Sequence, residues 1–139
     1  MRGAWLAGVL AWAACSAPPP ASDVPNTALA TSLQVDVGAE AVTFALHVTN
    51  PTRTAVELRF PTGQRYDFSV MTPGGGELWR WSADQMFTQA VGADTLAPGQ
   101  SVTYRAEWRP SNQSGRFTAR GWVTSEDLKL EQATEFEVR

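Results

Sequence analysis

Apolar and polar residues alternate along most of the chain after residue 30, and this pattern predicts β-strands. In the run AVTFALHV at residues 41–48, every second residue is apolar: Val42, Phe44, Leu46 and Val48. An alternation with a period of two is typical of a strand that has one buried face and one solvated face. The same pattern predicts strands at residues 33–37, 55–60, 66–70, 77–81, 102–108, 116–123 and 135–138.

Short segments rich in proline and glycine separate these runs. They are NPT at 50–52, PTG at 61–63, PGGG at 73–76, APG at 97–99 and PSNQSG at 110–115. Proline and glycine interrupt regular structure and favour turns. Seven to eight short strands, with a turn about every ten residues, predict one all-β domain folded as an antiparallel β-sandwich.

The stretch ELWRWSADQMF, residues 77–87, predicts a strand that continues into a short helix. Ser82 and Gln85 have the S-x-x-Q spacing of a capping box, which marks the start of a helix. We therefore expect one or two helical turns over residues 83–90. Helical spacing would place three residues on one side of these turns: Met86, Phe87 and Ala90.

Four tryptophans follow the N-terminal segment, and two interpretations of them stay open. Aromatic side chains in strands usually fill the core, because each buries about 150–250 Å². We expect this for Trp79, Trp81 and Trp108, whereas Trp122 has the opposite phase from its apolar neighbours and is compatible with half exposure. The alternative is a sugar-binding platform, in which Trp79 and Trp81 would form an exposed flat row.

The first residues resemble an export signal of the lipoprotein type. Arg2 precedes the apolar run AWLAGVLAWAA, and Cys15 follows it directly. This run is shorter than the roughly 20 apolar residues that span a bilayer. Ala13 and Ala14 resemble a bacterial lipobox, in which the cysteine is acylated and becomes the new N-terminus. An ordinary cleaved signal, which would give a secreted or periplasmic soluble protein, is the alternative.

These features divide the chain into three segments. Residues 1–14 are the expected export signal, and residues 15–31 are the lipidated cysteine and a flexible tether rich in proline, alanine and serine. Residues 32–139 are the expected β-sandwich domain. We expect an exported monomer in the cell envelope, anchored to the membrane through Cys15.

No pattern of residues supports an enzyme. The one histidine, His47, lies in the outward phase of a strand and has no neighbouring histidine or cysteine that could complete a metal site or a catalytic set. The net charge of −3 comes without a basic stripe, so nucleic acid is not an expected partner. A single cysteine allows no internal disulfide. We expect no catalytic residue, no metal and no cofactor.

Four blocks of the sequence resemble the BsuPI family, named for an intracellular proteinase inhibitor. They are NPTRTAVELRFPTGQRYDFSV, ELWRWSADQMFTQA, TLAPGQSVTYRAEW and GRFTARGWV, and the resemblance covers residues 32–138. It implies an immunoglobulin-like β-sandwich and, for the founding members, inhibition of a subtilisin-like serine proteinase inside the cell. The export signal of this chain departs from that setting, so its target would be a different enzyme.

The resemblance also implies roles for individual residues. Structural roles fall on the motif positions Gly63, Tyr66, Phe68, Trp79, Trp81, Phe87, Pro98, Gly99 and Trp108. The glycines among them are expected to serve turns with positive φ. We expect contact with a partner from Arg80, Asp84, Gln85, Gln64 and Arg65.

The expected function is that of a tethered, inhibitor-like domain that binds a serine proteinase. A rigid sandwich can present a loop in extended form, which pairs as an added strand in the cleft of the enzyme. Three segments could supply this loop: residues 71–77, 82–95 and 109–115. The alternative is a surface lipoprotein without inhibitory activity, which would have a binding or structural role and could bind glycans.

Overall fold

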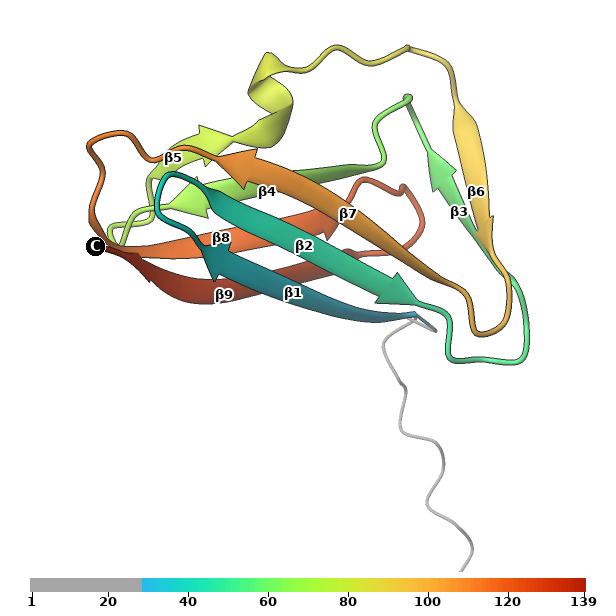
Figure 1. Cartoon of the computed structure of the whole chain (residues 1–139). Helices are drawn as coiled ribbons and strands as arrows, with labels where there is room; N and C mark the ends of the chain where they lie inside the picture. The colour runs from blue at the N-terminus through green and yellow to red at the C-terminus, as the bar shows by residue number, and fades with distance from the viewer. Residues whose placement is uncertain (1–28) are drawn as a thin grey trace, which may run out of the picture.

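The computed structural model describes residues 29–139, which form nine strands and one 3-10 turn (Figure 1). In chain order the elements are β1 (Ala30–Val37), β2 (Val42–Thr49), β3 (Val56–Phe60), β4 (Tyr66–Met71), β5 (Glu77–Arg80), η1 (Trp81–Asp84), β6 (Gly92–Leu96), β7 (Ser101–Trp108), β8 (Gly115–Val123) and β9 (Leu130–Val138). The predicted export signal, Cys15 and most of the predicted tether lie outside the described residues.

The strands form two main sheets and a short ribbon, and every pair is antiparallel. One sheet has the order β1-β2-β7, the other has the order β5-β4-β8-β9, and β3 pairs with β6. Figure 1 shows the two main sheets face to face, with the β3–β6 ribbon at one end. The prediction of an all-β sandwich is confirmed, with nine strands in the described residues instead of seven to eight.

Aromatic rings dominate the core between the two sheets. Phe44 of β2 stacks on Phe68 of β4 with ring centroids 5.9 Å apart, and both side chains are fully buried. Trp108 of β7 meets Phe136 of β9 edge to face, at 6.2 Å. Burial of each such side chain stabilises the fold by about 1.5–3 kcal/mol. The apolar face predicted for residues 41–48 is confirmed by its burial.

Strand β6 was not predicted, because its sequence GADTL has no alternation of apolar and polar residues. Only Leu96 at its end is buried, and the residues before it are exposed or half-buried. The strand exists because it pairs with β3, from Val56 opposite Leu96 to Phe60 opposite Gly92. Long-range pairing therefore creates a strand that local pattern cannot indicate.

The helix predicted over residues 83–90 is wrong. Only the 3-10 turn η1 forms, and Gln85 after it is extended, with φ −112° and ψ 154°. The Ser82 hydroxyl, which a capping box needs for the start of the helix, instead donates to Asp67 Oδ2 at 2.5 Å. As a result Met86 and Phe87 do not share a side: Met86 is exposed and Phe87 is half-buried.

The exposed face of the first sheet carries the single histidine. The His47 Nδ1 atom is hydrogen-bonded to the Thr103 hydroxyl on the neighbouring strand, at 2.9 Å. Residues 29–139 contain no cluster of three or more His, Cys, Asp or Glu side chains that could hold a metal ion. The same part of the chain has no helix long and apolar enough to cross a membrane.

Candidate functional site

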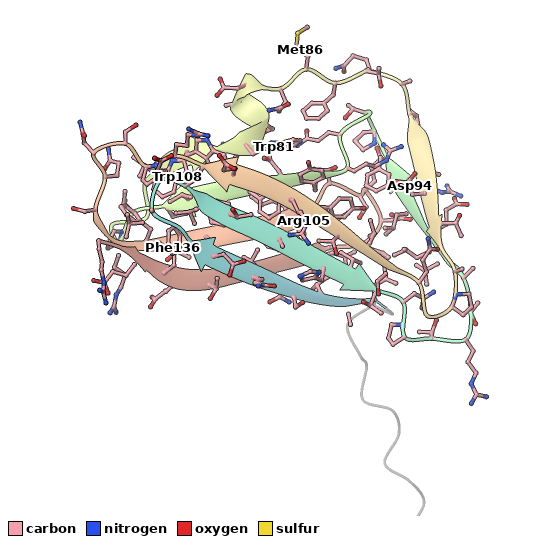
Figure 2. All side chains as sticks on the ribbon, in the orientation of Figure 1. Trp81, Met86, Asp94, Arg105, Trp108 and Phe136 are labelled. Carbon is pink, nitrogen blue, oxygen red and sulfur yellow. The ribbon has the colours of Figure 1, made fainter. Side chains whose placement is uncertain are left out.

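Between η1 and β6 the chain crosses the outside of the sandwich, and we call the first four residues of this crossing, residues 85–88, the strap. In Figure 1 it runs over the top of the molecule toward the β3–β6 ribbon. Met86 on the strap is 98% exposed, and Figure 2 shows its side chain directed away from the body of the domain. The strap is therefore an extended surface segment that carries a large apolar side chain into solvent.

A buried carboxylate holds the turn that precedes the strap. Asp67 in β4 is 2% exposed, and its Oδ1 atom accepts hydrogen bonds from the Ser82 N–H at 3.0 Å and the Phe68 N–H at 2.9 Å. The Ser82 hydroxyl donates to the other carboxylate oxygen. Hydrogen bonds to a charged acceptor are stronger than neutral ones. This contact fixes the position at which the chain leaves the sheet.

Aromatic stacking supports the same turn from below. Trp81 in η1 stacks on Tyr66 with ring centroids 4.4 Å apart, and Tyr66 stacks on Tyr104 of the opposite sheet at 4.8 Å. Phe87 of the strap lies against Trp81 at 5.8 Å. Stacked and tilted pairs of this kind add about 0.5–1.5 kcal/mol each beyond their buried area. They connect the strap to the core through a continuous row of rings.

The far end of the strap is held by the turn between β3 and β4. The Gly63 N–H donates to the Thr88 carbonyl oxygen at 2.8 Å. A Cβ atom at position 63 would lie 2.5 Å from the Thr88 hydroxyl and 3.3 Å from its backbone nitrogen. The positive φ expected for Gly63 is wrong, since this residue is not among the positive-φ glycines. Glycine is needed here because another backbone approaches closely.

Arg65 is held within the domain. Its Nε atom donates to Asp94 Oδ2 of β6 at 2.8 Å, one Nη atom donates to the Thr62 carbonyl at 3.0 Å, and its guanidinium lies 4.3 Å from the Phe60 ring centroid. The Gln64 side chain is also used internally, because it donates to the Tyr66 carbonyl at 3.0 Å. These two predicted contact residues position the turn beneath the strap.

Arg80, the last residue of β5, lies on the outer face of the four-stranded sheet. It donates to both carboxylate oxygens of Glu77, at 2.9 and 2.6 Å, and its guanidinium lies 5.3 Å from the Trp122 ring. Arg120, which is paired with Glu131, lies on the same ring at 5.6 Å. The Arg80 hydrogen bond lowers the pKa of Glu77 from its ordinary value. Trp122 is half-buried within this row of charges.

Two other predicted contact residues lie at the start of the strap. Asp84 and Gln85 are exposed, and the Gln85 N–H closes the turn by donating to the Ser82 carbonyl at 3.1 Å. The five predicted contact residues therefore fall into three groups. Asp84 and Gln85 lie at the start of the strap, Gln64 and Arg65 lie in the turn that holds its end, and Arg80 contacts Glu77 and Trp122 on the four-stranded sheet. Sequence reasoning did not identify Met86 as a contact residue, because the expected helix would have placed it on the same side as Phe87 and Ala90.

The remaining structural motif positions lie in the core or in turns. Trp79 stacks on Phe44 at 5.8 Å and lies 6.5 Å from Trp108, so its ring packs on core aromatics. Trp79 and Trp81 are both half-buried and do not form an exposed flat row. Gly99, which follows exposed Pro98, has φ 76°, as predicted for a turn glycine.

Two loops that were alternatives to the strap lie near the C-terminus (Figure 1). The turn at residues 72–76 is closed by hydrogen bonds from the Thr72 N–H to the Gly76 carbonyl at 2.8 Å and from the Gly75 N–H to the Thr72 carbonyl at 2.9 Å. The loop at residues 109–114 contains Ser111 with φ 50°. Neither loop carries an exposed large hydrophobic residue.

The described residues thus form an antiparallel β-sandwich that carries one anchored and exposed segment, the strap. The sequence profile of the BsuPI family, described as intracellular proteinase inhibitor, matches residues 29–128. The chain belongs to this family, and its domain is therefore proteinase-inhibitor-like. A search of curated proteins finds no match.

Two solved structures illustrate what this chain is similar to. A penta-heme cytochrome c552 from Thermochromatium tepidum has a TM-score of 0.50 at 10% identity, over 81% of this chain and 40% of that chain. A β-glucosidase from Kluyveromyces marxianus in complex with glucose has a TM-score of 0.44 at 14% identity, over 80% of this chain and 14% of that chain. The chain thus spans less than half the length of either protein. The cytochrome likeness shows the fold alone.

Proposed function

We propose that this domain inhibits a serine proteinase of the subtilisin-like class and that it does so outside the cytosol. Membership of a proteinase-inhibitor family supports a proteinase as the partner. The observation that carries the proposal is the strap, which is exposed in its middle and fixed at Ser82 and Thr88 on either side. A loop of this kind can enter the cleft of an enzyme while the sandwich stays outside.

Fixed ends matter because binding has to overcome the entropy of ordering a loop. Each side chain immobilised on binding costs about 0.5–1.5 kcal/mol, and a preorganised loop has lost part of this freedom before it meets its partner. The buried Asp67 carboxylate and the close approach at Gly63 restrict the strap in the free domain. Inhibitors that bury a standard interface of about 1,600 Å² reach high affinity by such preorganisation.

The N-terminal sequence supports a location in the cell envelope. A short apolar run ends at Cys15, and a segment rich in proline, alanine and serine separates this cysteine from β1. An acylated Cys15 would anchor the chain, and the segment after it would act as a tether. In the host cell, the full-length chain is then expected to sediment with membranes and the Cys15→Ser variant is not.

Titration of a serine proteinase with the domain tests the inhibitor function. We would use residues 15–139 with Cys15→Ser, add increasing amounts to subtilisin, and measure residual activity on a small substrate. Loss of activity in proportion to the added domain, with the domain itself uncleaved, is the expected result. Full activity at large excess, for several subtilisin-like enzymes, would contradict the proposal and favour a binding lipoprotein without inhibitory activity.

A further inference from the structure

Met86 is the most exposed large hydrophobic side chain of the described residues. Only three such side chains are exposed in residues 29–139: Val37 at 47%, Val91 at 79% and Met86 at 98%. Val37 lies at the end of β1 and Val91 lies next to the start of β6. Of the three, only Met86 lies between the hydrogen bonds at Ser82 and Thr88 that hold the strap.

The backbone at Met86 is as free as its side chain. The hydrogen bonds that hold the strap use the Gln85 N–H on one side and the Thr88 carbonyl on the other. Within residues 29–139, neither the N–H nor the carbonyl of Met86 is bonded to another backbone group. Gln85 is in the extended conformation that an added strand requires. A partner strand could therefore pair with the backbone of Met86 without first breaking a bond inside the domain.

The two residues after Gln85 have opposite surroundings, as in a strand. Phe87 turns inward and rests on Trp81, while Met86 points outward. In a strand, successive side chains point to opposite sides, so one can contact the domain and the next can contact a partner. Phe87 therefore holds the strap against the domain, and the Met86 side chain remains accessible to a partner.

We propose that Met86 enters the primary specificity pocket of the target proteinase and that residues 85–88 lie in its cleft as an extended, substrate-like strand. This inference rests on the proposed inhibitor function and adds the contact residue and the chemistry of the pocket. A methionine side chain is unbranched and polarizable, and it adapts well to apolar pockets. The partner is therefore a serine proteinase whose specificity pocket is an apolar slot, without a buried charge at its base.

Exchange of one side chain tests this assignment, because the charge of the pocket should select the charge of the residue. The experiment uses residues 15–139 with Cys15→Ser, which we call the unchanged chain. It is compared with its Met86→Lys, Met86→Leu and Val91→Lys variants. Each is titrated against subtilisin, which represents the proposed class of enzyme, and against trypsin, whose pocket has an aspartate at its base. All four proteins are expected to unfold at similar temperatures, since both positions are exposed.

Met86→Lys is expected to weaken inhibition of subtilisin by roughly 100-fold or more and to create inhibition of trypsin. Met86→Leu should retain inhibition of subtilisin within about tenfold, because it keeps an apolar side chain of similar size. Val91→Lys adds the same charge three residues after the strap, so it should change the inhibition constant for subtilisin by no more than about threefold and create no inhibition of trypsin.

The outcomes separate the two proposals. If the unchanged chain inhibits subtilisin and Met86→Lys inhibits it equally well, Met86 is not the contact residue and the inhibitor function stands. The same conclusion follows if Val91→Lys weakens inhibition as much as Met86→Lys, because the effect would then be one of charge. If the unchanged chain inhibits no serine proteinase, the inhibitor function is wrong and this inference falls with it.

Discussion

Asn50 shows how much structure a single buried polar residue can organise. Its side chain is fully buried, and its amide nitrogen donates to the carbonyl oxygens of Thr54 at 2.8 Å and Leu96 at 2.9 Å. Its side-chain oxygen accepts from the N–H and the hydroxyl of Thr52. The residue thus joins the turn after β2 to the end of β6, and it satisfies groups that would otherwise be buried without partners.

Replacement of Asn50 by alanine is expected to destabilise the domain by about 3 kcal/mol. The carbonyl oxygen of Leu96 would lose its partner, and the desolvation cost of such buried groups is not recovered. Urea unfolding followed by tryptophan fluorescence would measure the change. Thr49→Ala is the control, because it removes a neighbouring hydroxyl pair with Ser101 that is exposed. A loss of less than about 0.5 kcal/mol for Asn50→Ala would contradict this role.

Two residues also explain why the local prediction around the strap failed. Ser82 and Gln85 have the spacing of a helix cap, but the Ser82 hydroxyl is bound by Asp67, which is distant in sequence. A buried carboxylate needs hydrogen-bond donors, and Ser82 supplies two of them. The two hydrogen bonds from Ser82 to the buried Asp67 carboxylate therefore outweigh the weak preference of a short segment for helix.

At the scale of elements, the strap depends on the close approach of two chain segments. The turn between β3 and β4 contributes Gly63, and the strap contributes Thr88. These residues lie in two of the blocks that resemble the BsuPI family, NPTRTAVELRFPTGQRYDFSV and ELWRWSADQMFTQA. The structure shows that the two blocks form one site, because Gly63 meets Thr88, Asp67 meets Ser82, and Tyr66 meets Trp81.

The variant Gly63→Ala is expected to destabilise the domain by about 1–3 kcal/mol, because its methyl group would overlap the Thr88 hydroxyl. Adding Thr88→Ala should recover part of this loss, since it removes the nearest atom. A double-mutant cycle measured by urea unfolding gives the coupling between the two positions. Gly74→Ala is a matched control with no atom within 4 Å of the new methyl group. Equal stability of Gly63→Ala and Gly74→Ala would contradict the close approach.

At the scale of the whole molecule, a row of aromatic rings joins the two sheets to the strap. Tyr66 of β4 and Tyr104 of β7 stack on each other across the sandwich, and Trp81 continues the row outward. Burial raises the pKa of the Tyr66 hydroxyl. Burial is also the main reason that the pKa of Tyr104 is raised, and the nearby Asp94 carboxylate adds to the effect.

The chain contains only these two tyrosines, so its alkaline behaviour can be assigned to them. An unfolded tyrosine ionises with a pKa near 10. Because the folded pKa values are raised, the stability that the tyrosines contribute is fully present below pH ~10 and is lost as the pH rises through the folded values. Tyrosinate absorbance of the folded domain should therefore develop above the pH at which free tyrosine titrates.

Denaturant unfolding across the same alkaline range measures the loss of stability, and Tyr104→Phe provides the control. This variant cannot ionise at position 104 and should lose less stability between neutral and alkaline pH than the unchanged domain. Tyrosinate formation in the folded domain with an ordinary pKa, together with pH-independent stability, would show that the stacked pair is not shielded from solvent as described.

The sequence by itself determined the fold class and most of the strands, because strands with one buried face leave a local record in the alternation of their residues. It also identified the blocks that form the site. The tertiary structure alone decided that β6 exists, that no helix follows Ser82, and that Met86 lies in solvent. Each of these depends on partners far along the chain: β3 for β6, Asp67 for Ser82, and Gly63 for the strap. The local sequence pattern contains no information about such partners, because they become neighbours only when the sheets form.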